Sequence, residues 1–145
     1  ELVNSVAGRL QVHTCSSQII KLSVQQGIML EGDKFALTSV VTNLIENAVK
    51  YSPACAEVIV SLKRSNGQIQ FIVADSGIGI NDQEKSRIFE KFYRVGSEDT
   101  RKTKGTGLGL FIVKQVLDKH QASIKVKNNQ PSGTIFEVTF NANAN

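Results

Sequence analysis

The sequence feature that most constrains the fold is an apolar stripe between Gly32-Asp33 and Ser52-Pro53. Its members recur at intervals of three and four residues: Leu37, Val40, Val41, Leu44, Ile45 and Ala48. This spacing is typical of a helix that packs one face on a core. Asp33 is placed to cap the helix, and Ser52-Pro53 ends it because proline disfavours helical geometry in the preceding residue. The rest of the fold must therefore pack against one long amphipathic helix.

The remaining segments predict an α+β fold. Helical patterns cover residues 1–14 and 108–119. Runs rich in apolar and β-branched residues predict short strands, at 19–24, 27–31, 58–62, 69–74, 123–127 and 134–140. We expect a turn at 25–27 to join the first two strands, and turns at 65–67 and 131–133 to join the later pairs as antiparallel hairpins. About three helices segregated from about five strands predict a two-layer α/β sandwich.

Three other stretches are defined less by apolar pattern than by local chemistry. Asn81 followed by Glu84 is like a capping box, which predicts a helix through Phe89 and Phe92. Residues 95–106 contain two glycines and almost no apolar side chains, which predicts a long mobile loop. Residues 141–145 alternate Asn and Ala and have nothing to pack, so we expect one domain over 1–140 and a frayed tail.

Composition excludes several classes of protein. In a chain of 145 residues, 41% hydrophobic and 21% charged residues argue against intrinsic disorder. Cys15 and Cys55 are too few for a disulfide framework, and no apolar run is long enough for a membrane span. We expect a soluble domain from a reducing compartment. The net charge of +4 leaves open a nucleic acid, a membrane surface or a small polyanion as the partner.

The long helix carries the first of three polar clusters. Asn43, Asn47 and Lys50 lie at i, i+4 and i+7 beside the apolar stripe, and Tyr51 follows at the helix end. Amide oxygens can bind a hard cation, and an ammonium group can bind phosphate. Taken alone, the same residues are more typical of a solvated helix face in which Glu46 and Lys50 form an ion pair.

The second cluster is Asp75-Ser76-Gly77-Ile78-Gly79-Ile80, directly after a predicted strand. Its glycines allow the backbone to approach a ligand closely. The Asp carboxylate could accept a hydrogen bond from an exocyclic amine, which would discriminate adenine from guanine. An Asp-Gly turn without a binding function is the alternative.

The third cluster is Gly105-Thr106-Gly107-Leu108-Gly109-Leu110, which leads into the helix predicted at 108–119. Backbone amides at a glycine-rich helix start bind phosphate with help from the helix dipole. The glycine spacing is neither the dinucleotide-binding fingerprint nor the P-loop. Residues 94–104, just upstream, hold four basic and two acidic side chains, a composition also typical of a solvated charged segment.

Taken together and in this order, the clusters resemble the nucleotide-binding boxes of Bergerat-fold (GHKL) ATP-binding domains. Among these they are most similar to the catalytic domain of bacterial sensor histidine kinases. Residues 43–53 look like the N box, 75–80 the G1 box, 88–94 the F box and 105–110 the G2 box. Gly133-Thr134 before the last strand is similar to the family's ending. The resemblance covers essentially residues 28–140.

The resemblance implies that the domain binds ATP with Mg²⁺. It implies that Asn47 coordinates the metal with support from Asn43, that Lys50 and Arg94 contact phosphate, and that Asp75 binds the adenine amino group. The candidate catalytic residues are Asn43, Glu46, Lys50 and Arg94. The candidate nucleotide-binding residues are Asn47, Lys50, Tyr51, Asp75, Gly77, Gly79, Ile80, Phe89, Phe92, Lys104, Gly105, Thr106, Gly107, Leu108, Gly109 and Leu110.

The segment 81–106 would then be a lid over the nucleotide, with Phe89 and Phe92 as its anchors. Many relatives have glycine where this chain has Lys104, so the closed shape of the lid there does not carry over.

One substitution within the resemblance separates kinase from hydrolase. Hydrolases of this superfamily place a Glu four residues before the metal-binding Asn, where it activates water; here that position is Asn43, whose amide is not a base. Glu46 lies about 100° around the helix and should not replace it easily. Phosphoryl transfer depends mainly on positioning and charge stabilisation, so this favours a kinase. The alternatives are a serine kinase of the anti-sigma type and a non-enzymatic module switched by nucleotide.

The phosphoacceptor is not apparent in the chain. Family members phosphorylate a histidine on a separate helical hairpin, usually followed by an acidic residue, whereas His13 precedes Thr14 and His120 precedes Gln121. We therefore expect as partners ATP, the protein's own dimerisation helices and a response regulator, and no nucleic acid. The isolated domain would be a monomer, and the full-length protein a homodimer. Its place would be the cytoplasmic side of a membrane-anchored bacterial sensor.

Overall fold

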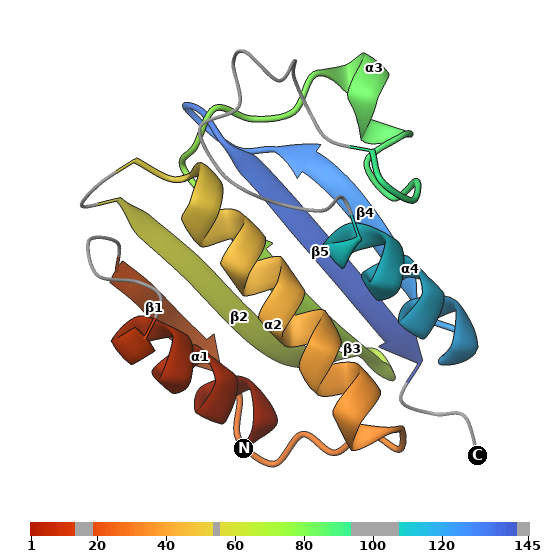
Figure 1. Ribbon diagram of the computed structural model, residues 1–145. Coiled ribbons are helices and arrows are strands. Elements are labelled where there is room, and N and C mark those ends of the chain that lie inside the picture. Colours follow the sequence, from red (N-terminus) through yellow and green to blue (C-terminus); the bar gives the residue numbers. More distant parts are fainter. Residues whose placement is uncertain (14–18, 54–55, 94–107, 142–145) are drawn as a thin grey trace.

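The computed structural model describes residues 1–13, 19–53, 56–93 and 108–141. Along the chain the elements are α1 (Leu2–His13), β1 (Ile19–Val24), α2 (Lys34–Tyr51), β2 (Glu57–Ser65), β3 (Gln68–Ala74), α3 (Asp82–Lys85), α4 (Gly109–Lys119), β4 (Ser123–Asn128) and β5 (Thr134–Asn141). Figure 1 shows α1, α2 and α4 lying across one face of a five-stranded sheet. The predicted two-layer α/β sandwich is confirmed.

The sheet has the strand order β1-β2-β3-β5-β4, in which β1 runs parallel to β2 and all other neighbours are antiparallel. The strand predicted at 27–31 is wrong, because residues 28–31 form no strand. β1 pairs instead with β2, with Ile19 opposite Glu57. Ile28 and Leu30 pack against the core while Met29 is 82% exposed. The alternation of buried and exposed apolar residues at 28–30 therefore belongs to a loop that packs on the core without pairing with a strand.

The core lies between α2 and the centre of the sheet. The buried residues of α2 are Val40, Val41, Leu44, Ile45, Ala48 and Val49. They share one cluster with the helix-facing residues of the central strands, Val58, Val60, Ile69, Phe71, Val73, Phe136, Val138 and Phe140. The helix begins and ends as predicted: Asp33 Oδ1 accepts a hydrogen bond from the Ala36 N–H at 3.1 Å, and Ser52 follows the last helical residue.

The β2–β3 hairpin turns through Asn66 and Gly67, which have φ angles of 54° and 75°. Two consecutive positive φ values are those of the tight turn that best matches the twist of a hairpin, and an Asn-Gly pair adopts it readily. This hairpin and the β4–β5 hairpin were both predicted, and both are confirmed.

The opposite face of the sheet carries charged side chains. Lys127 Nζ on β4 lies 2.9 Å from Glu137 Oε2 on β5. This hydrogen bond lowers the pKa of the Glu137 carboxyl, and the nearby Lys125 and Lys63 add to the effect.

The segment after β3 differs from the predicted helix. Asn81 does cap α3, its Oδ1 accepting from the Gln83 N–H at 2.9 Å, but the helix ends at Lys85. The capping box is not closed, because Glu84 accepts a hydrogen bond from the Tyr93 hydroxyl at 2.7 Å. Residues 86–92 continue as turns, and Phe92 has a φ of 67°.

Two predicted segments border on residues outside the described ranges. The helix predicted at 108–119 is confirmed as α4, which begins at Gly109. β5 runs to Asn141, opposite Gln68, so this residue of the predicted tail belongs to the sheet. The loop predicted at 95–106 and residues 142–145 lie outside the described residues. In the described parts of the chain, no helix is both long and apolar enough to cross a membrane.

Candidate functional site

The polar stripe of α2 faces the start of α4. Asn43 Nδ2 donates to the Ser39 carbonyl at 2.9 Å and to Ser39 Oγ at 3.1 Å. A Cβ added to Gly109 would lie 3.0 Å from Asn43 Oδ1, so glycine allows the first turn of α4 to sit close to this amide. The first cluster and the end of the third, which are 66 residues apart from Asn43 to Gly109, therefore meet in the structure.

The rest of the stripe is accessible. Asn47 and Tyr51 are half-buried, and Lys50 is exposed. Neither Glu46 nor Lys50 takes part in an ion pair within the described residues, so the structure does not show the pair expected of a purely solvated face. Lys50 lies exposed at the C-terminal end of α2, and none of the described acidic side chains pairs with it.

Asp75 is a buried carboxylate at the end of β3, with only 3% of the residue exposed. Its Oδ1 accepts hydrogen bonds from the Gly77 N–H at 2.9 Å and the Thr134 N–H at 3.2 Å. Among the described residues nothing hydrogen-bonds to Oδ2. Burial raises the pKa of the carboxyl, and the two backbone donors oppose this shift. A buried polar atom without a partner is uncommon in folded proteins, so Oδ2 indicates a ligand.

Two glycines allow three backbone segments to converge around this carboxylate. A Cβ on Gly77 would lie 2.1 Å from the Tyr51 carbonyl oxygen, at the end of α2. A Cβ on Gly133, before β5, would lie 1.9 Å from the Asp75 carbonyl oxygen. Any side chain at either position would force these backbones apart. The end of α2, the end of β3 and the start of β5 therefore meet at one point.

Other predicted site residues lie in varied surroundings. Ile80, Phe89 and Leu110 pack against the core. Phe92 is 63% exposed, which departs from the expectation that it anchors the lid; the Lys91 ammonium lies 5.3 Å from its ring centre. Gly79 has a φ of 79°, which glycine adopts readily. Arg94, Lys104, Gly105, Thr106 and Gly107 lie outside the described residues.

Sequence reasoning did not identify three residues that surround Asp75. Gly133-Thr134 was noted only as a typical ending, although Thr134 is buried and its N–H donates to the carboxylate. Asn129 was not noted at all, yet its Nδ2 donates to the Asp75 carbonyl at 2.8 Å. The contact spans 54 positions in the sequence, so no local pattern could have indicated it.

The arrangement fits a nucleotide. Asp75 Oδ2 is a buried acceptor for an amine, while Asn47 and Lys50 offer an amide and a cation on the neighbouring helix. The described residues contain no group of three or more His, Cys, Asp or Glu side chains able to hold a metal. A metal here would therefore depend mainly on oxygens of the ligand, which is how proteins commonly bind Mg²⁺ together with phosphates.

Comparison with known proteins agrees with this geometry. A family model described as "Histidine kinase-, DNA gyrase B-, and HSP90-like ATPase" matches residues 32–144. The chain is 37% identical over 140 residues to the sensor-like histidine kinase SenX3 of Mycolicibacterium smegmatis. That match covers 96% of this chain and 36% of SenX3, so the chain spans about a third of that relative's length.

Solved structures show the same fold. A mycobacterial sensor histidine kinase, MprB, superposes with a TM-score of 0.84 at 30% identity, covering 96% of this chain and 91% of that one. Full-length ShkA in complex with AMPPNP gives a TM-score of 0.79 at 26% identity, covering 96% of this chain and 29% of ShkA. The chain thus belongs to the histidine kinase-, DNA gyrase B- and HSP90-like ATPases, as an ATP-binding domain of the sensor histidine kinase type.

Proposed function

We propose that this domain binds ATP together with Mg²⁺ and donates the γ-phosphoryl group to a histidine on a separate dimerisation domain in two-component signalling. The observation that carries the proposal is the Asp75 carboxylate, which is buried and held through Oδ1 while its Oδ2 has no partner in the described chain. A carboxylate in this state is suited to accept a hydrogen bond from the adenine amino group.

The remaining roles follow from the placement of the polar residues. Asn47 would hold the metal through its amide oxygen, with Asn43 supporting it from one turn earlier on α2. When bound, Mg²⁺ would neutralise the negative charge of the phosphates. Lys50 would contact phosphate from the exposed end of α2, and the backbone amides at the start of α4 would face the same group.

In the proposed transfer, a ring nitrogen of the acceptor histidine attacks the γ-phosphorus with its lone pair and an N–P bond forms. The bond from phosphorus to the β,γ-bridging oxygen breaks, and its electron pair leaves with ADP. The second ring nitrogen then releases its proton to solvent. Asn43 supports transfer over hydrolysis, because its side-chain amide hydrogen-bonds Ser39 and is no base for water.

Similarity to sensor histidine kinases, of which this chain spans about a third, supports a further domain that carries the acceptor. We accordingly assign dimerisation helices and a response regulator as partners, and a cytoplasmic position in a membrane-anchored sensor. The serine-kinase and switch alternatives remain as outcomes of the test below.

The test is reconstitution with the helical hairpin of the same protein and ATP labelled at the γ-phosphorus. We expect the isolated domain to bind ATP without labelling itself, and the hairpin to acquire an acid-labile phosphoryl group. An acid-stable phosphoester would indicate the serine kinase, and ATP binding without transfer would indicate the nucleotide switch. Label on His13 or His120 would contradict the proposal directly.

The metal role has its own variant. Asn47→Ala should weaken Mg²⁺-dependent ATP binding by about tenfold, because one ligand oxygen is lost, and should leave the metal-independent component unchanged. Calorimetric titrations with and without Mg²⁺ measure both. Asn4→Ala on the exposed face of α1 is the matched control. Equal binding by Asn47→Ala and the unmodified domain would refute the assignment.

A further inference from the structure

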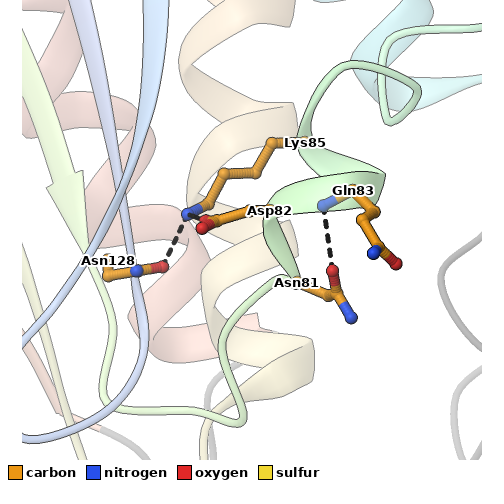
Figure 2. A network of polar contacts seen from close by, with 5 residues as sticks. All are labelled: Asn81, Asp82, Gln83, Lys85 and Asn128. Carbon is orange, nitrogen blue, oxygen red and sulfur yellow. Dashed lines mark hydrogen bonds and ion pairs between the residues drawn. The ribbon is translucent and has the colours of Figure 1, made fainter.

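The connection between β4 and β5 contacts two points of the chain that follows β3. Asn128, the last residue of β4, accepts a hydrogen bond from Lys85 Nζ on α3 at 2.7 Å, as Figure 2 shows. Its neighbour Asn129 donates from Nδ2 to the Asp75 carbonyl at 2.8 Å. Two adjacent side chains therefore hold the end of α3 and the end of β3 separately.

Asn129 has little freedom to move. Its backbone N–H donates to the Gly133 carbonyl at 3.0 Å, and its Oδ1 accepts from the Gln130 N–H at 2.9 Å. With Nδ2 bound to Asp75, the side chain uses its donor and its acceptor groups at once. Rotation of the amide would break both the Nδ2 and the Oδ1 hydrogen bonds.

Residues at both ends of the β4–β5 connection, Asn129 and Thr134, hydrogen-bond to Asp75. Thr134 accepts from the Asp75 N–H at 2.9 Å and donates to Asp75 Oδ1 at 3.2 Å. Asn129 Nδ2 donates to the Asp75 carbonyl. Gly133, with a φ of 110°, lies close against the same carbonyl. The orientation of the carboxylate, and with it that of Oδ2, depends on these contacts.

We propose that Asn129 is a positioning residue for adenine recognition. Its amide fixes the main chain of Asp75 and thereby the direction in which Oδ2 faces a ligand. The proposal rests on the proposed function, in which Asp75 accepts a hydrogen bond from the adenine amino group. Because such a bond depends steeply on distance and angle, a displaced carboxylate would lose the amino group while other parts of the nucleotide still bind.

The test compares ATP with purine ribonucleoside triphosphate, which lacks only the 6-amino group. Calorimetry with the unmodified domain should show tighter binding of ATP. Asn129→Ala should reduce the affinity for ATP by about fivefold, the loss of one hydrogen bond, and leave the affinity for the analogue unchanged. An equal loss for both ligands, or no loss for either, would overturn the proposal.

Two control variants separate the positioning of Asp75 by Asn129 from a general destabilisation of the β4–β5 connection. Lys85→Met removes the contact to Asn128 and the ion pair with Asp82, but touches nothing at Asp75. It should lower stability while preserving the preference for ATP over the analogue. Gln130→Ala, on an exposed side chain of the same turn, should change neither. A reduced preference in Lys85→Met would show that the effect belongs to the whole connection.

A second Asn129 variant covers the case in which alanine impairs folding. Asn129→Asp keeps the acceptor for the Gln130 N–H but replaces the donor to Asp75 with an oxygen, so it should reduce the preference at least as much. Measurements on the unmodified domain distinguish failure of the adenine role of Asp75 from failure of the positioning role of Asn129. If it binds both triphosphates equally, the adenine role of Asp75 fails; if it prefers ATP and both Asn129 variants do so equally, only the positioning role fails.

Discussion

The two ends of α2 are built alike but differ in what they leave unsatisfied. At each end a glycine allows another segment to approach the helix: Gly32 lies against His120 beside the N-cap, and Gly77 lies against Tyr51 at the last turn. At the N-terminal end both ring nitrogens of His120 and the Asp33 N–H have hydrogen-bond partners. At the C-terminal end the neighbouring Asp75 is buried with one oxygen lacking a partner among the described residues.

His120 makes the N-terminal end a closed contact. Its Nε2 accepts from the Asp33 N–H at 3.1 Å, so the ring proton must be on Nδ1, which lies 2.8 Å from the Val116 carbonyl. Both ring nitrogens are thereby used in tying α4 to the start of α2. The two ends differ in that the His120 ring nitrogens at one are hydrogen-bonded, whereas the buried Asp75 at the other has an oxygen without a partner in the described residues, which makes it the candidate for binding a ligand.

The largest expected effect comes from filling the two glycine contacts. Gly77→Ala would place a Cβ 2.1 Å from a backbone oxygen, which cannot move aside, and should lower the free energy of unfolding by about 3 kcal/mol and abolish ATP binding. Gly32→Ala would meet the His120 ring at 2.8 Å, and a ring can rotate away at a cost of about 1 kcal/mol. Denaturant unfolding of both variants measures the difference. Equal losses of stability in the two variants would contradict the expected difference between the two ends of α2.

Replacing Asp75 Oδ2, which has no hydrogen-bond partner in the described parts of the chain, should separate the effect on ATP binding from the effect on stability. Asp75→Asn retains an acceptor for the Gly77 and Thr134 N–H groups but places an amide where Oδ2 was, so ATP affinity should fall by about tenfold or more. Because burial raises the pKa of this carboxyl, its ionised form destabilises the fold. The variant should therefore be at least as stable as the unmodified domain at pH 7. The gap should close below pH 3.8, the ordinary pKa of the group. Titration calorimetry and unfolding against pH check both; a less stable variant with unchanged affinity would reverse the argument.

A substitution at the N-terminal end of α2 should lower stability and leave ATP affinity nearly unchanged. His120→Ala removes the acceptor of the Asp33 N–H and should cost about 1 kcal/mol of stability, with ATP affinity changed less than about twofold. Thermal unfolding and calorimetry of the same preparation give both quantities. A large loss of ATP affinity with little loss of stability would show that this end also belongs to the site.

The smallest effect on stability is expected for Glu137, on the other face of the sheet. Its pH dependence should be opposite in sign to that of Asp75. Lys127 lowers the pKa of Glu137, so Glu137 stabilises the fold above its ordinary pKa of 4.5, and this contribution is lost as the pH falls through its lowered pKa. Glu137→Gln should cost less than about 1 kcal/mol at pH 7, and nothing in strong acid. Unfolding measured against pH should thus show a dependence opposite to that of Asp75→Asn. The same direction for both would contradict the contrast between a carboxylate paired within the fold and one left for a ligand.

Local patterns were sufficient for the elements whose causes are local. The cap at Asp33, the stop at Ser52-Pro53 and the Asn66-Gly67 turn each depend on neighbouring residues, and each was predicted correctly. The strand at 27–31 failed because β2, not the adjacent loop, is the partner of β1. The helix through Phe92 failed because Glu84 hydrogen-bonds Tyr93 rather than closing the capping box.

For the site, the sequence by itself was enough to name candidate residues, since the spacing of Asn43, Asn47 and Lys50 on a helix and the carboxylate after a strand are local features. The tertiary structure was needed to show which of these groups is buried and which of its atoms lack a hydrogen-bond partner among the described residues. Asp75 is oriented by Thr134 and Asn129, which lie 59 and 54 positions away in the chain, and by glycines that allow backbones to meet. Burial and hydrogen-bond satisfaction are properties of the packed molecule, so no local pattern could have revealed that Asp75 Oδ2 lacks a partner among the described residues.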